Sequence, residues 1–470
     1  MRNADDFLRS LEDGRAVYYR GELVRSVVHH PVLGVCSRHA AKLFGVAREC
    51  PDPVLGIPIS RYYLPSRSPE DLSARHRLIY ASTLACNGVF NISQAIGSDA
   101  ISALSIVGRA VDRAQGTAYA GRVESYRQLV ASRDLTVAVA QTDVKGDRAR
   151  RPHEQADPDL YLRITEVRPD GIVVTGAKAH TTQAAVSDEI IVLPTRAMSD
   201  RDADYAVAFA VPVATPGLTL VTRPVEELEG NDQALLSRLD FESETLTVFQ
   251  DVFVPTERVF LCREHAYAGP LAVGFATHHR FTAVSYRAAT ANLYLGTASL
   301  VARANGIEGA SHVRDKLLRL VVYKEIMRTS ALAAAQAPVF QEGLAVPNPL
   351  YTNLGKLYSN QNFASVLEAL VDLAGGIAAT LPARADFENP EERPLLTKYL
   401  AGAEGADRRV NVLRLAKELG VSTFAGYMLT LMVHAEGSVE ASKLSLLRDY
   451  DLGEAERLVE GILRAASNEP

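Results

Sequence analysis

The chain is short of cysteine, and this shortage excludes several kinds of site. Only four cysteines occur in 470 residues, and none of them forms a CxxC or another close pair. That spacing argues against a local zinc site, and so few thiols are typical of the reducing cytoplasm. We predict that each is a small buried residue, namely Cys36, Cys50, Cys86 and Cys262.

Tryptophan is absent, and no basic patch is interleaved with aromatic residues. The net charge of −6 is small for this length and gives no general attraction to nucleic acid or anionic membranes. No apolar run reaches the roughly 18 residues that span a bilayer. The first residues, MRNADDFLRSLEDGR, are polar and acidic, unlike a signal peptide. We therefore expect a cytoplasmic protein that binds neither nucleic acid nor membranes.

Common nucleotide and hydrolase motifs are also missing. The sequence contains no GxGxxG after a strand, no GxxxxGK[ST], no HExxH and no GxSxG. Any nucleotide cofactor must therefore be held by another device.

What is present indicates a globular chain of two or three packed units, with 47% hydrophobic and 23% charged residues. Residues 1–134 have helical spacing, with Ser68 as the predicted cap of a helix over 68–92 and a further helix over 97–114. Residues 135–264 have the texture of β-structure. The alternating run LYLRITEV and the run IVVTGAKAH, joined by RPDG at 168–171, predict a hairpin.

Residues 265–470 are helical again. Four long candidates predict a four-helix bundle, over 278–306, 313–337, 353–376 and 407–420. The predicted fold is therefore α+β, with an N-terminal helical domain (1–134), a middle β-barrel or sandwich domain (135–264) and a C-terminal bundle and tail (265–470). This order is typical of the acyl-CoA dehydrogenase-like fold, an analogy that names no function.

One polar segment, QTDVKGDRARRPHEQADPD (141–159), is crowded with charges between two strand-like runs. It is either a solvated connection or a site for an anionic ligand. Spacing alone leaves both interpretations open.

Four segments in order carry a resemblance to a known superfamily. They are residues 142–195, DVFVPTERVF (251–260), DLAGGIAATLP (372–382) and VSTFAGYMLTLMVHAEGS (421–438). Together they resemble the flavoproteins that include 4-hydroxybutyryl-CoA dehydratase and the oxygenase components of 4-hydroxyphenylacetate 3-hydroxylase. The similarity runs over most of the chain and is tightest from about 135 to 260.

The resemblance implies an FAD site built from three segments. Loop amides with Lys145 and Arg148 suit a pyrophosphate, and threonine hydroxyls can hydrogen-bond the edge of a flavin ring. Arg150, Arg151 and the residues after them are expected to form a solvated turn. The implied FAD-binding residues are Gln141, Thr142, Asp143, Lys145, Gly146, Asp147, Arg148, His180, Thr181, Thr182, Ser422, Thr423, Phe424 and Ala425.

The chain departs from both branches at the substrate. The dehydratase holds a four-iron cluster with three cysteines and a histidine, and those positions match Asn91, Ala95, Tyr286 and His279. Only the histidine is kept, so we expect no iron–sulfur cluster. A dehydratase tyrosine matches Ala283. The residues that handle the phenol in the hydroxylases match Ile96, Ala100 and Val139, which predicts an apolar substrate pocket, while Asp99 keeps its type.

The predicted catalytic residues are His279, Tyr286 and Arg287. His279 and Tyr286 are seven residues apart and lie on one helical face, and Arg287 matches an arginine of the hydroxylase branch. A histidine with a pKa near neutrality could move a proton. The alternative is a core histidine and tyrosine joined by hydrogen bonds. His434 matches a position near the end of the flavin site.

Three functions remain open at this stage. The first is a flavin-dependent oxidoreductase, a two-component FADH2-dependent monooxygenase that oxidises a small organic substrate through a C4a-hydroperoxyflavin, with reduced FAD supplied by a separate NAD(P)H:flavin reductase. The second is an FAD-dependent acyl-CoA isomerase or dehydrogenase without an iron–sulfur cluster. The third is a non-catalytic flavin-binding scaffold. The resemblance also implies a homotetramer.

Overall fold

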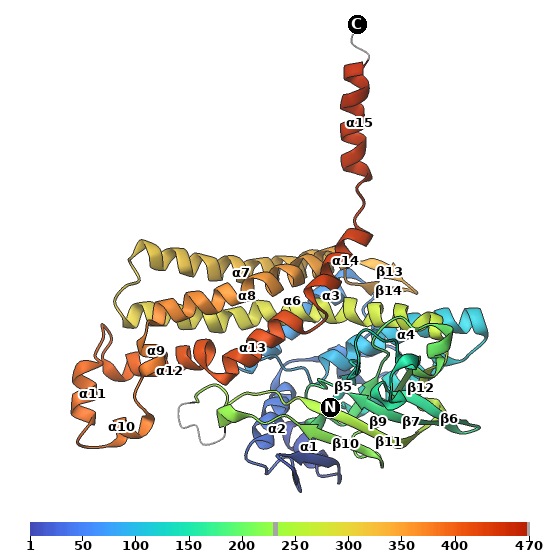
Figure 1. Ribbon diagram of the computed structural model, residues 1–470, viewed down its shortest axis with the longest axis horizontal. Helices are drawn as coiled ribbons and strands as arrows, with labels where there is room; N and C mark the ends of the chain where they lie inside the picture. The colour runs from blue at the N-terminus through green and yellow to red at the C-terminus, as the bar shows by residue number, and fades with distance from the viewer. Residues whose placement is uncertain (229–233, 468–470) are drawn as a thin grey trace.

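The computed structural model describes residues 1–228 and 234–467 (Figure 1). Long helices from the C-terminal part of the chain lie along one side of two β-sheets, and the helices of the N-terminal part pack between and beside them (Figure 1). The hydrophobic core is one large cluster that draws residues from all three regions.

The first 134 residues are mainly helical, as predicted. Ser68 caps α3, because its Oγ accepts a hydrogen bond from the Asp71 N–H at 3.2 Å. That helix ends at Ala85 rather than at 92, because Asn87 and Gly88 have left-handed backbone angles. The helices of this part are α1 (Ala4–Ser10), α2 (Leu33–Ala41), α3 (Pro69–Ala85), α4 (Ala95–Gln115) and α5 (Tyr119–Arg133).

Short strands that the sequence did not predict also occur here. They are β1 (Ala16–Tyr19), β2 (Glu22–Leu23), β3 (Glu49–Pro51) and β4 (Pro58–Ser60). β1 pairs in parallel with a strand of the middle region, β10 (Leu218–Thr222).

The middle region contains the predicted run of strands. The expected hairpin is confirmed as β6 paired antiparallel with β7, with Arg168 opposite Gly171. The strands of this region are β5 (Val137–Ala140), β6 (Arg163–Arg168), β7 (Gly171–Lys178), β8 (Glu189–Val192), β9 (Val207–Pro212), β10, β11 (Thr245–Pro255) and β12 (Val259–Cys262).

These strands form two open sheets. Their orders are β2-β1-β10-β11-β7-β6 and β12-β9-β8-β5. The rings of Phe209 on β9 and Phe249 on β11 meet edge to face at 5.9 Å and join the two sheets. The described strands therefore do not close into the barrel that we named as one possibility, because each sheet ends at an unpaired edge.

The C-terminal region is helical, as predicted. The first long helix begins earlier than expected, at His265, and α6, α7 and α8 contact one another, while α12 contacts α6 and α8. Its elements are α6 (His265–Ala304), α7 (Ser311–Gln336), β13 (Val339–Gln341), β14 (Leu344–Val346), α8 (Pro349–Ala374), α9 (Ile377–Thr380), α10 (Arg384–Glu388), α11 (Arg393–Tyr399), α12 (Ala406–Val421), α13 (Thr423–His434), α14 (Val439–Asp449) and α15 (Gly453–Ser467).

The last helix, α15, extends away from the body of the molecule (Figure 1). None of its residues is buried. Among the helices that the structure describes, none is both long and apolar enough to cross a membrane.

Candidate functional site

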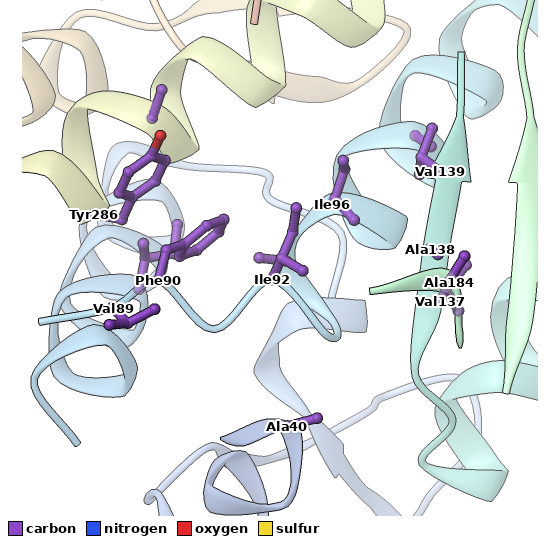
Figure 2. Packing of buried hydrophobic residues seen from close by; sticks show 14 of the residues in the cluster. Ala40, Val89, Phe90, Ile92, Ile96, Val137, Ala138, Val139, Ala184 and Tyr286 are labelled. Atoms are coloured by element: carbon purple, nitrogen blue, oxygen red, sulfur yellow. The ribbon is translucent and has the colours of Figure 1, made fainter. Parts of the chain in front are cut away.

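An apolar wall forms where α4 packs on β5. Gly97 permits this contact, because a Cβ at this position would lie 2.4 Å from the Cβ of Val137. Ile96 and Val139 are buried here, at 8% and 5% exposure, and Ala100 lies one turn further along α4. In Figure 2, Ile96 and Val139 lie on one side of Ile92, and Tyr286 stacks on Phe90 on the other. The three residues predicted to line an apolar pocket therefore share one region of the core.

The loop Gln141–Arg148 leaves the end of β5 and is anchored by Asp143. This buried carboxylate lies 2.8 Å from the Nζ of Lys178 and accepts hydrogen bonds from the Leu162 N–H and the Thr195 hydroxyl. Lys178 also donates to the carbonyl oxygen of Gln141 at 3.0 Å. The Asp143 side chain is thus occupied by internal contacts and holds the loop in place.

The tip of the loop has a fixed left-handed conformation. Lys145 and Gly146 have φ angles of +76° and +47°. A Cβ on Gly146 would lie 2.5 Å from the Oε1 of Gln155, so glycine lets the Gln155 side chain come close to the backbone here. The same Oε1 accepts the N–H of Asp147 at 3.0 Å. Gln155 therefore braces the tip, and the predicted solvated tail has a structural role.

Cations gather at this tip. Lys145 lies near Arg148 and Arg196, and burial, together with these two positive charges, lowers the pKa of the Lys145 ammonium. Arg196 was missed by sequence reasoning. It follows β8, which runs parallel to β5, so both loops leave the same edge of the sheet. An excess of positive charge on a preformed loop suits a phosphate or pyrophosphate.

The neighbouring arginines behave differently. Arg150 is exposed and pairs with Asp147 at 3.2 Å. Arg151 does not fit the expected solvated turn, because it bonds the fully buried carboxylate of Asp202 at 2.5 Å. It therefore fastens the loop to the rest of the middle region.

The strand end His180–Thr182 lies beside the loop, since the Ala179 N–H donates to the carbonyl oxygen of Thr142 at 2.8 Å. His180 is exposed with a φ of +58°. Thr181 is buried and accepts a hydrogen bond from the Thr247 hydroxyl at 2.9 Å. Two of the three predicted FAD segments are thus adjacent.

The third segment starts α13. Ser422 caps this helix, and its Oγ accepts hydrogen bonds from the N–H groups of Phe424 and Ala425 at 3.1 and 3.4 Å. Phe424 and Ala425 are buried, whereas Thr423 is exposed. His434, at the far end of the same helix, is exposed as well.

Glu244 connects the strand end with α13. Its carboxylate accepts hydrogen bonds from the Thr182 hydroxyl and the Tyr427 hydroxyl, each at 3.0 Å. Burial raises the pKa of Glu244 to about 7. Sequence reasoning missed this residue, although two glutamates before a strand-like run, FESETLTVF, are an unusual pattern that could have flagged it. All three predicted segments are therefore brought into one neighbourhood.

His279 meets a buried carboxylate. Its Nδ1 lies 3.1 Å from the Oδ2 of Asp99, whose Oδ1 bonds Arg75 at 2.6 Å. Phe275 stacks on the imidazole ring, with 5.3 Å between centroids. His279 is 8% exposed and Asp99 is 1% exposed.

Tyr286 and Arg287 converge on Glu436, which follows α13. The Tyr286 hydroxyl donates to Oε1 at 2.9 Å, and the Arg287 guanidinium donates to Oε2 at 2.6 Å. Burial raises the pKa of the Tyr286 phenol, so it stays protonated and can donate. The structure therefore joins His279 and Tyr286 not to each other but to two different carboxylates.

Lys356 lies in the same buried network and was also missed. It is 0% exposed, donates to Asn360 Oδ1 at 2.7 Å and lies 3.8 Å from Glu436. Burial and the neighbouring Arg287 lower the pKa of this ammonium to about 7. A lysine close to the apolar residues Leu354, Leu357 and Tyr358 was the available signal.

The positions that match cluster ligands are filled by other contacts. Asn91 donates through Nδ2 to the His39 carbonyl oxygen at 2.9 Å and lies 3.5 Å from the Sγ of Cys86. Ala95 is buried at the start of α4. These side chains present no thiolate at the required places.

His39, Cys86 and Asp240 lie close enough together to suggest a metal site. However, the Nδ1 of His39 lies 2.9 Å from Asp240, and its Nε2 lies 3.0 Å from the Phe90 carbonyl oxygen. Burial opposes charge on the ring, but the Asp240 carboxylate outweighs it and raises the pKa of His39 to about 10. A doubly protonated imidazole has no lone pair for a metal.

Comparison with known families places these features in context. A family model described as "4-hydroxyphenylacetate 3-hydroxylase N terminal" matches residues 3–261, and one described as "4-hydroxyphenylacetate 3-hydroxylase C terminal" matches residues 268–464.

Two curated relatives show similar levels of identity. The chain is 30% identical to the 4-hydroxybutyryl-CoA dehydratase/vinylacetyl-CoA-Delta-isomerase of Clostridium aminobutyricum, over 98% of this chain and 99% of that protein. It is 31% identical to the 4-hydroxyphenylacetate 3-monooxygenase oxygenase component of Thermus thermophilus, over 87% of this chain and 86% of that protein.

Solved structures of both kinds are similar. An archaeal 4-hydroxybutyryl-CoA dehydratase from N. maritimus matches with a TM-score of 0.93 and 28% identity, covering 98% of this chain and 95% of that chain. The oxygenase component of a 4-hydroxyphenylacetate 3-monooxygenase, complexed with FAD, matches with a TM-score of 0.91 and 25% identity, covering 99% of each chain.

Proposed function

The chain belongs to the 4-hydroxyphenylacetate 3-hydroxylase family, and from this membership we propose that it is the oxygenase component of an FADH2-dependent monooxygenase. Several relatives are oxygenase components by name, and one is an FADH(2)-dependent monooxygenase. The substrate would be a small organic molecule. The chemistry that FAD supplies when bound is the reductive activation of molecular oxygen.

The residues of the candidate site fit FAD. Lys145 and Arg148, with Arg196 beside them, would neutralise the pyrophosphate at the braced loop tip. The remaining loop residues, the strand end His180–Thr182 and the start of α13 at Ser422–Ala425 would complete the cradle. What supports this assignment is that three segments far apart in the sequence meet through Thr142, Ala179 and Glu244.

The chain's own residues would then shape the chemistry. Ile96, Ala100 and Val139 would form a dry wall that keeps water from the reacting centre. His279 would exchange a proton through the Nε2 atom. Glu436 fixes Tyr286 and Arg287 on α6, and these two side chains would position the substrate or the flavin.

One observation carries the choice of monooxygenase over dehydratase. The three positions that match the cluster cysteines hold Asn91, Ala95 and Tyr286, and each is built into the surrounding core. We therefore propose that the protein binds no iron–sulfur cluster.

A second candidate is an FAD-dependent acyl-CoA isomerase or dehydrogenase. The observation that favours it is the end-to-end similarity to the dehydratase, at 30% identity over 98% of the chain. In that case His279 would act as the base on the thioester substrate.

The proposal extends to the organisation of the protein. We keep the division into 1–134, 135–264 and 265–470. We also keep an acyl-CoA dehydrogenase-like bundle of α6, α7, α8 and α12, which is supported by the contacts among α6, α7 and α8 and by those of α12 with α6 and α8. A homotetramer, a separate NAD(P)H:flavin reductase and a cytoplasmic location also belong to this proposal.

The decisive experiment mixes the purified protein, loaded with chemically reduced FAD, with oxygenated buffer in a stopped-flow spectrometer. A transient absorbance distinct from both reduced and oxidised FAD is expected, because a dry pocket slows reoxidation. Immediate reoxidation, together with tight binding of a CoA thioester, would support the second candidate instead. Stoichiometric iron in the protein would contradict the cluster-free site.

The loop assignment is tested by FAD affinity. Replacing Lys145 and Arg148 with glutamine should weaken FAD binding about 10- to 100-fold, because charge-assisted hydrogen bonds to the pyrophosphate are lost. Arg150→Gln is the matched control, since Arg150 is exposed on the same loop and pairs with Asp147. Equal loss in the control and the double variant, measured by titration calorimetry, would show that the loop does not clamp FAD.

A further inference from the structure

We propose that Asp99, which is held in place by Arg75, is a positioning residue for His279. Asp99 makes Nε2 the imidazole nitrogen that accepts the proton. The inference rests on the proposed function only in giving His279 a proton to move. It adds Arg75 of α3 and Asp99 of α4 to the residues already assigned to the site.

The geometry fixes the tautomer. Asp99 Oδ2 lies 3.1 Å from His279 Nδ1, and a carboxylate with a lowered pKa can only accept. Nδ1 must therefore carry the proton, and the lone pair of the neutral ring lies on Nε2. Among residues 1–228 and 234–467, no group hydrogen-bonds Nε2.

Arg75 fixes the carboxylate itself. Its guanidinium donates to Asp99 Oδ1 at 2.6 Å, to the Ser98 hydroxyl at 2.8 Å and to the Ala95 carbonyl oxygen at 3.0 Å. Thr282 adds a hydroxyl donor to Oδ1 at 3.1 Å. A side chain with this many partners cannot turn, so Asp99 keeps Oδ2 on the imidazole.

The ring is also held across its face. Phe275, one turn before His279 on α6, stacks on the imidazole at an interplanar angle of 14°. Because the Phe275 stacking and the Asp99 hydrogen bond act together, the imidazole ring is held in one orientation. The donor and acceptor stand 180 residues apart in the sequence, so the packing of α4 on α6 creates the pair.

The charges around His279 are few. Asp99 faces it from α4 and Arg75 from α3, while Glu436 acts on it from the turn after α13. His278 is adjacent on α6, but its Nδ1 bonds the Gly274 carbonyl oxygen and burial lowers the pKa of its ring. Asp99 is thus the nearest charge, and its own charge is partly balanced by Arg75.

The proton step that follows is simple. An O–H bond of the substrate breaks, the electron pair stays on oxygen, and the proton bonds to the lone pair of Nε2. The resulting imidazolium is stabilised by Asp99. The imidazolium then gives its proton to the product or to solvent.

The test reads His279 directly, in the full-length protein without flavin. Diethyl pyrocarbonate reacts with an imidazole only in its unprotonated form, and tandem mass spectrometry separates His279 from His278. The pH midpoint of His279 modification should fall in Asp99→Asn, because the carboxylate no longer stabilises the charged ring. It should rise in Arg75→Gln, because Asp99 then lacks its balancing cation.

Thr282→Val is the matched control. It removes one hydroxyl from Asp99 but leaves the Asp99–His279 pair, so the midpoint should stay at the parental value. A midpoint in Asp99→Asn equal to the parental one would overturn the proposal. So would shifts of the same sign in Asp99→Asn and Arg75→Gln, since general loosening of the fold moves both alike.

The same variants separate this inference from the proposed function. With a turnover assay, Asp99→Asn should lower kcat about 10- to 100-fold with little change in KM. If the modification midpoints move as expected but reduced FAD shows no oxygen chemistry, the positioning of His279 by Asp99 is supported and the monooxygenase proposal fails. If kcat and the midpoint are both unchanged in Asp99→Asn, the positioning role of Asp99 is rejected and the proposed function is unaffected.

Discussion

At the scale of single residues, the candidate site is notable for carboxyl groups kept from water. Glu242 is 4% exposed and accepts a hydrogen bond from the Ile92 N–H at 3.3 Å. Burial raises its pKa from 4.5 to about 8, although the His39 charge opposes this. A carboxyl group that stays protonated inside the fold makes the stability of the fold depend on pH.

The sign of that dependence follows from linkage. Between pH 4.5 and 8 the unfolded chain has lost the Glu242 proton and the folded chain has kept it. The free energy of unfolding therefore falls by up to about 1.4 kcal/mol per pH unit as the pH rises through this window. Glu242→Gln keeps the acceptor but cannot ionise, so the dependence should become shallower.

Chemical denaturation at several pH values between 5 and 8 measures this slope. A slope that is the same in Glu242→Gln and the parent would mean that Glu242 is ionised in the folded protein.

Composition and spacing alone left the role of the loop Gln141–Arg148 open. That loop, His279 and Tyr286 were predicted because their segments resemble those of a known superfamily. Glu244, Glu436 and Arg196 were not, because their partners come from distant segments. Tyr286 and Glu436, for example, are 150 residues apart.

At the scale of elements, the contact of α4 with β5 sets the apolar wall. Gly97→Ala should destabilise the protein by about 1–3 kcal/mol, because the added Cβ would overlap Val137, whose Cβ and carbonyl oxygen lie 2.4 and 2.9 Å away. Thermal unfolding followed by circular dichroism measures the effect.

Gly121→Ala is the control for that substitution. Gly121 lies in α5, and no atom lies within 4 Å of an added Cβ. Alanine should leave the melting temperature unchanged or raise it slightly, since it favours helix over glycine. A loss as large as that of Gly97→Ala would contradict the packing argument.

The long helices of the C-terminal region and most strands of the middle region were predicted, whereas the short strands of the N-terminal region were not. Caps such as Ser68 and apolar spacing predict the helices, and the turn sequence predicts the β6–β7 hairpin. β1 and β2 have only 4 and 2 residues, too few for a periodic signal. The order of strands within a sheet depends on pairing between distant segments, so the sequence left barrel and sandwich undecided.

At the scale of the whole molecule, α15 is unusual among the long helices because none of its residues is buried. Its apolar side chains Leu458 and Ile462 are 70% and 62% exposed, and an isolated helix of 15 residues is marginal in water. Within the proposed homotetramer, this stripe would pack on another subunit. Replacing both residues with serine should shift the assembly to smaller species in sedimentation velocity.

Glu456→Ser with Glu460→Ser is the control, because these residues lie on the polar side of the same helix. Unchanged sedimentation of the Leu458 and Ile462 variant would show that the helix takes no part in assembly.

The parallel pairing of β1 with β10 has a consequence for how the protein is made. Residues 16–19 leave the ribosome about 200 residues before their partners at 219–222. Throughout that time the native partner available to β1 is the two-residue strand β2, and the other edge of β1 is unpaired. The six-stranded sheet can be completed only after β11 has emerged at residue 255. The open edge of β1 must therefore be kept from pairing with other nascent chains over about half of the synthesis.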